Sequence, residues 1–117
     1  MAIPDADLIL SALRLALPRV EVSEKGVRAA VQQARGLARW SIDEPAAVFF
    51  AFACRPRIAP TIGHQLALFL ARDQLATLAL QLAADDDELI ALRLRVLLRE
   101  IGSADVLAWF AERLPAE

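Results

Sequence analysis

Residues 62–83, IGHQLALFLARDQLATLALQLA, decide the fold that the sequence predicts. Apolar side chains fill most positions of this segment, and it contains no proline. Its polar residues form one narrow stripe, made of Gln65, Asp73, Thr77 and Gln81, with Arg72 and Gln74 beside it. A helix that is apolar almost all round is usually buried. We therefore predict a helix from about Ile62 to Ala83 at the centre of a helical bundle.

Helical patterns lie on both sides of this segment. Three helices are predicted before it: from Asp5 or Asp7 to about Leu17, from Glu24 to about Arg39 behind the cap Ser23, and from the Ser41–Glu44 capping signature through Cys54. Two are predicted after it: one starts in the acidic run Asp85–Glu88 and stops at Gly102, and a short last helix starts at Ser103. The sequence thus predicts an all-α fold, a compact bundle of about six helices around a buried central helix, as a single domain over residues 1–117.

The apolar positions also predict which side chains form the core. In the first helix the residues expected on the buried side are Leu8, Leu10, Leu13, Leu15 and Leu17. Those expected deep between the third and fourth helices are Phe50, Phe52, Leu66, Leu70 and Leu78. Trp40 and Trp109 lie at helix ends, where an indole usually completes a core.

Composition narrows the class of protein. Apolar residues make up 57% of the chain, above the usual share, so either the core is large or a partner covers apolar surface. The net charge of −2 argues against nucleic acid as the main ligand.

No signal peptide is visible, and Arg72 and Asp73 would be costly in a bilayer, so we expect a soluble, cytoplasmic protein. The lone Cys54 excludes an internal disulfide and fits a reducing compartment. Twelve of the 13 basic residues are arginine, which favours a GC-rich bacterial genome.

The segment Arg55–His64 is the candidate functional loop. It contains two prolines, a glycine and the only histidine, and it precedes the most apolar helix. Arg55, Arg57, Thr61 and His64 are the candidates for an anion- or nucleotide-binding site, because free N–H groups at a helix start favour negative charge. The loop has no carboxylate, so no catalytic residue is predicted. One histidine and one cysteine do not make a metal site, and no cofactor is predicted.

The order of these segments resembles the Fic/Doc (death-on-curing) family, in its short Doc-like branch. The resemblance lies in Glu24–Arg35, in Pro45–Pro56 and in the C-terminal stretch from Asp85 to Phe110. The family motif is His-Pro-Phe-x-Asp-Gly-Asn-Lys-Arg. When the prolines are aligned, Arg55 stands at the histidine and Ala59 at the metal-binding acid. A shift of one residue puts Pro56 at the histidine and Pro60 at the acid. The resemblance therefore implies a catalytically silent relative.

Three functions remain open at this point. We expect a non-catalytic protein-binding module on a Fic/Doc-like scaffold, derived from a toxin–antitoxin pair, whose partner is an antitoxin-like helix laid in an apolar groove. The first alternative is an active nucleotide-dependent transferase toxin that binds phosphates through Arg55, Arg57, Thr61 and His64. The second is a homo-oligomer whose excess of apolar residues forms its own interface.

Overall fold

The computed structural model describes residues 3–62 and 65–115. The described residues form six α-helices and two short 3-10 helices, and no strand occurs among them. In chain order they are α1 (Ala6–Ala16), α2 (Glu24–Leu37), η1 (Ser41–Asp43), α3 (Glu44–Ala53), η2 (Pro56–Ile58), α4 (Gln65–Thr77), α5 (Asp86–Leu97) and α6 (Ser103–Arg113). The prediction of an all-α bundle of about six helices is confirmed.

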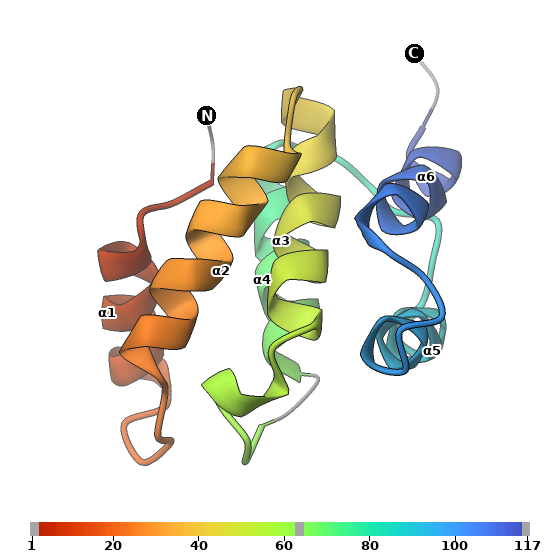
Figure 1. The fold of residues 1–117 in the computed structure, drawn as a ribbon. Coiled ribbons are helices and arrows are strands. Elements are labelled where there is room, and N and C mark those ends of the chain that lie inside the picture. The colour runs from red at the N-terminus through yellow and green to blue at the C-terminus, as the bar shows by residue number, and fades with distance from the viewer. Residues whose placement is uncertain (1–2, 63–64, 116–117) are drawn as a thin grey trace.

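Figure 1 shows how the helices are arranged. Helices α1 to α4 alternate in direction, so that α1 and α3 run down the view while α2 and α4 run up it. Helices α5 and α6 lie together on the side of α3 away from α1. Most of the buried apolar side chains join in one cluster that reaches from α1 to α6. The elements therefore share a common core.

The centre of this core is α3, and not the fourth helix as the sequence suggested. Every residue of α3 except Phe50 is buried, and α3 packs against α2, α4, α5 and α6. Four of its ten residues are alanines that are at most 1% exposed, which lets neighbouring helices approach closely. Phe49 meets Phe110 of α6 at 5.5 Å between ring centroids. Helix α4, by contrast, leaves Phe69 59% exposed.

The fourth helix is also shorter than predicted. It begins at Gln65 and ends at Thr77, whereas we expected it to reach Ala83. Ala79 adopts a left-handed conformation with φ of 55°, and the amide of Leu80 donates to the carbonyl of Leu75 at 2.8 Å. These features close the helix without the glycine that usually marks such an end. The amide of Ala83 then donates to Arg113 O at 2.8 Å, so the chain turns toward α6 instead of continuing as a helix.

The predicted core is correct for some side chains and wrong for others. Phe52, Leu66 and Leu70 are buried, but Phe50 and Leu78 are only partly buried, the latter because it lies just beyond the end of α4. In α1 the buried residues are Ala6, Ile9, Leu10 and Leu13. Leu8 and Leu15 were expected inside and are 63% and 85% exposed, and Trp40 is also exposed. These exposed apolar side chains are the first indication of a binding surface.

Candidate functional site

The predicted loop is fixed to the bundle through Arg55. Its Nη1 atom donates to the carbonyl of Ala51 at 2.9 Å and to Oε1 of Gln33, and it lies 3.3 Å from Sγ of Cys54. Ala51 is in the last turn of α3 and Gln33 is in α2. The guanidinium group therefore joins the end of α3 to α2, and its Nη1 hydrogen bonds are used inside the protein.

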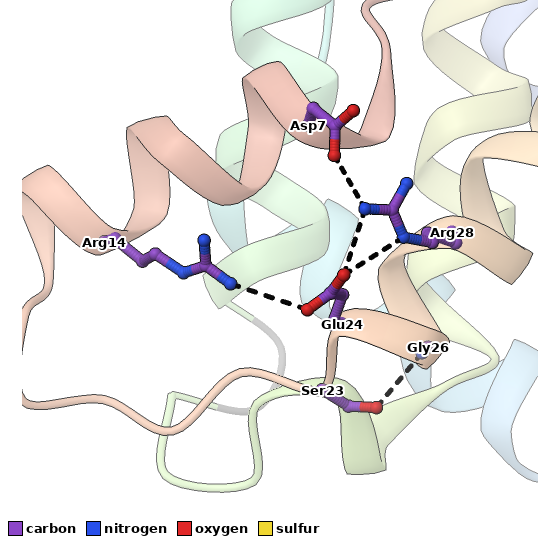
Figure 2. A network of polar contacts seen from close by, with 6 residues as sticks. All are labelled: Asp7, Arg14, Ser23, Glu24, Gly26 and Arg28. Carbon is purple, nitrogen blue, oxygen red and sulfur yellow. Dashed lines mark hydrogen bonds and ion pairs between the residues drawn. The ribbon is translucent and has the colours of Figure 1, made fainter.

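The start of α2 holds the other side of the loop. The amide of Ser23 donates to the carbonyl of Ile58 at 2.7 Å, and Ser23 Oγ accepts from the amide of Gly26 at 3.0 Å (Figure 2). A Cβ atom on Gly26 would lie 2.7 Å from Cγ1 of Ile58, so only glycine fits here without displacement. This close approach, and not backbone flexibility, accounts for the glycine.

These contacts shape a shallow hollow beside the loop. It has a volume of about 340 Å³ and is lined by Ser23, Gly26, Cys54, Arg55, Pro56, Arg57 and Ile58. The structure thus brings Arg55 and Arg57 to one hollow. Thr61 is exposed and does not line it, and His64 lies outside the described residues. Burial raises the pKa of the Cys54 thiol although Arg55 beside it acts in the opposite direction, so Cys54 is a poor nucleophile at neutral pH. Anion binding by these residues stays a prediction.

A second and more apolar feature lies between α1 and α4. It is an open groove of about 340 Å³, and nine of the ten described residues that line it are apolar. These are Ile9, Ala12, Leu13, Ala16 and Leu17 from the first helix and its end, and Ile62, Leu66, Phe69 and Leu70 from the fourth helix and the turn before it, while Gln65 is polar. None of these ten side chains is charged. The groove runs along about two turns of α1, because Ile9 to Ala16 spans roughly 10 Å at the α-helical rise, and along about one and a half turns of α4, from Gln65 to Leu70.

Large apolar side chains border the groove. Phe69 both lines it and is exposed, and Leu8 and Leu15 precede and follow Ala12 by four and three residues, which places them on the same side of α1. Contiguous apolar surface of this kind is uncommon on a soluble monomer and marks interaction sites. Among the described residues, the groove and its border are therefore the surface best suited to binding.

The opposite flank of α1 is polar and fixes the helix to α2. Figure 2 shows Arg28 of α2 between two carboxylates, with its Nη2 atom 2.6 Å from Asp7 and 3.0 Å from Glu24. Arg14 lies 3.7 Å from the other oxygen of Glu24. The hydrogen bonds that Arg28 donates to Glu24, followed by the one it donates to Asp7, raise the pKa of Arg28, so this guanidinium stays charged. These contacts link the polar flank of α1 to α2, while its apolar flank faces α4 and solvent.

The groove is not expected from the sequence when all five leucines of the predicted first helix are assigned to the core. A signal was nevertheless present. Leu8 and Leu15 lie about 120° or more around the helix from Leu10 and Leu13, and one buried stripe does not accommodate both pairs. A helix with apolar residues on two faces is expected to pack against two neighbours. In this fold one face of α1 packs into the core, and the other remains exposed.

The chain matches no protein-family model, and it matches neither a curated protein nor a solved structure. The resemblance to the Fic/Doc family accordingly stays a prediction from the sequence. None of the helices in the described part of the chain is long and apolar enough to cross a membrane.

Proposed function

We propose that this protein is a non-catalytic binding module that holds an amphipathic helix of a protein partner in the groove between α1 and α4. The observation that carries the proposal is the open apolar groove with Phe69, Leu8 and Leu15 exposed along it. Burying such side chains on association is favourable by roughly 25 cal/mol per Å² of apolar surface, before the costs of association.

The chemistry of the groove favours a helix as its occupant. Gln65 is the one polar residue among the described residues of the lining, so an extended peptide would find few hydrogen-bond partners for its backbone there. The described residues include no strand whose edge could pair with such a peptide. A helix satisfies its own backbone and presents apolar side chains at every third or fourth position, which suits a groove two turns long.

The Fic/Doc resemblance supports the same proposal, since antitoxins of that family lay a helix in a groove of their partner. The proposal does not depend on it, because the groove and its exposed border are features of this chain. A second copy of the chain is the competing occupant, and the experiment distinguishes it from a partner helix.

The proposal can be tested by photo-crosslinking from the edge of the groove. A benzoylphenylalanine in place of Leu15 should crosslink, in the native host, to a segment with apolar residues at helical spacing. The same group in place of Leu98, a leucine that is 69% exposed and follows the last residue of α5, serves as the control. Crosslinking from position 15 should be lost in Phe69→Ser, whose thermal unfolding should stay close to that of the original protein because Phe69 is largely exposed.

Two results would contradict the proposal. Equal products from positions 15 and 98 would show that the groove has no selectivity. Products that contain only a second copy of this chain would assign the groove to self-association, which light scattering would confirm.

A further inference from the structure

One end of the groove carries a carboxylate without a partner. Ile9 and Leu70 line the groove and also a small recess next to it, and that recess includes Asp73. Asp73 is therefore located at the end of the groove where α1 begins and α4 approaches its C-terminus. Its side chain is exposed, and no hydrogen bond or ion pair engages its carboxylate among the described residues.

The neighbouring charges do not neutralise this group. Arg72 precedes Asp73 in the chain but pairs with Asp86 of α5 at 2.5 Å. Consecutive residues on a helix point in different directions, so Arg72 does not turn back toward Asp73. Arg35 of α2 pairs with Asp5 at 2.7 Å. Both arginines, Arg72 and Arg35, are therefore paired with carboxylates other than that of Asp73.

We infer that the partner helix carries a lysine or arginine at the end of its apolar stripe, where it meets Asp73. This inference rests on the proposed function. The described residues that line the groove carry no charge, and apolar contact alone is nearly insensitive to sequence and register. The carboxylate of Asp73 at one end attracts a helix that places a cation there and repels a helix that places an acid there. Complementary charge of this kind contributes more to specificity than to affinity.

The test uses two synthetic helices as probes. Each is an alanine-based peptide of about 18 residues, long enough to be partly helical alone, with leucines at helical spacing. One has a lysine at the end of the leucine stripe and its twin has a glutamine there. Binding is measured by fluorescence anisotropy to the original protein, to Asp73→Asn and to Asp87→Asn. Asp87 is an exposed aspartate of α5 outside the groove, so its variant controls for net charge.

The lysine probe should bind the original protein and Asp87→Asn about twofold to fivefold more tightly than the glutamine probe, the range that exposed ion pairs give. This preference should vanish in Asp73→Asn and weaken in high salt. Equal binding of the two probes to the original protein, with loss of both in Phe69→Ser, would overturn this inference and leave the proposed function in place. Failure of both probes to bind would overturn the inference together with the function on which it rests.

Discussion

Replacing Gly26 by alanine should destabilise the protein, although alanine is the better helix former. An added Cβ would lie 2.7 Å from Cγ1 of Ile58 and 3.1 Å from Ser23 Oγ. Ile58 cannot move away cheaply, because its side chain is 3% exposed and its carbonyl accepts from Ser23 at 2.7 Å. Overpacking of this kind costs about 1–3 kcal/mol, against a gain in helix propensity of at most about 1 kcal/mol. The net change should therefore be a loss of stability.

Gly36 of the same helix provides the matched control. Apart from its chain neighbours and the backbone of its own helix, no described atom lies within 4 Å of a Cβ built there, so Gly36→Ala should be neutral or stabilising by up to about 1 kcal/mol. Urea unfolding followed by circular dichroism should separate the two variants by about 1–3 kcal/mol, which is the cost of the clash itself. In an Ile58→Ala background, where Cγ1 is absent, Gly26→Ala should become almost as favourable as Gly36→Ala. If Gly26→Ala stabilises the original protein as much as Gly36→Ala does, the packing of α2 against the loop is not as described.

Four other measurements test the structure and the loop. Leu70→Ala should lower the free energy of unfolding by about 2–5 kcal/mol, because Leu70 is buried between α3 and α4, and an unchanged midpoint would contradict its burial. Incubation with labelled ATP and bacterial lysate should give no protein label above a boiled control, and transfer that disappears in Arg57→Ala would refute this. If Arg57 binds an anion, sulfate should raise the melting temperature more in the original protein than in Arg57→Ala, and equal shifts would leave it a solvated residue. Because burial raises the pKa of Cys54, iodoacetamide at pH 8 should alkylate it more slowly than a free cysteine until urea unfolds the protein, and equal rates would contradict its burial.

Local interactions explain what the sequence could predict. Ser23 caps α2 through the amide of Gly26, as expected from its position before an apolar-periodic run. At the start of α5, Asp85 and Glu88 form a reciprocal capping box, with hydrogen bonds of 2.9 and 3.3 Å. Each of these capping hydrogen bonds joins residues that are three positions apart in the chain. Their chemistry is therefore visible in the sequence without knowledge of the fold.

The errors come from interactions between distant segments. Residues 78–83 continue the apolar pattern of α4, but the helix has ended by Ala79, which is left-handed. The amide of Ala83 then donates to the carbonyl of Arg113, 30 residues further along the chain. A left-handed alanine costs about 1–2 kcal/mol, which contacts with the rest of the fold must offset. The centre of the bundle was misassigned for a related reason. Length and apolar content favoured the fourth helix, whereas the alanines of α3 allow helices to surround it on all sides.

The groove shows that one helix can both fill the core and expose an apolar flank. From the sequence, the excess of apolar residues has two explanations, a large core or a surface that a partner covers, and composition alone does not separate them. In the structure, Leu10 and Leu13 are buried, while Leu8 and Leu15 remain outside beside the groove. Arg28 pairs with Asp7 on the polar flank of α1, but this pair is exposed to solvent, so the burial of Ile9, Leu10 and Leu13 contributes more to the orientation of the helix. Both explanations therefore apply to α1, because one of its faces belongs to the core and the other borders the groove.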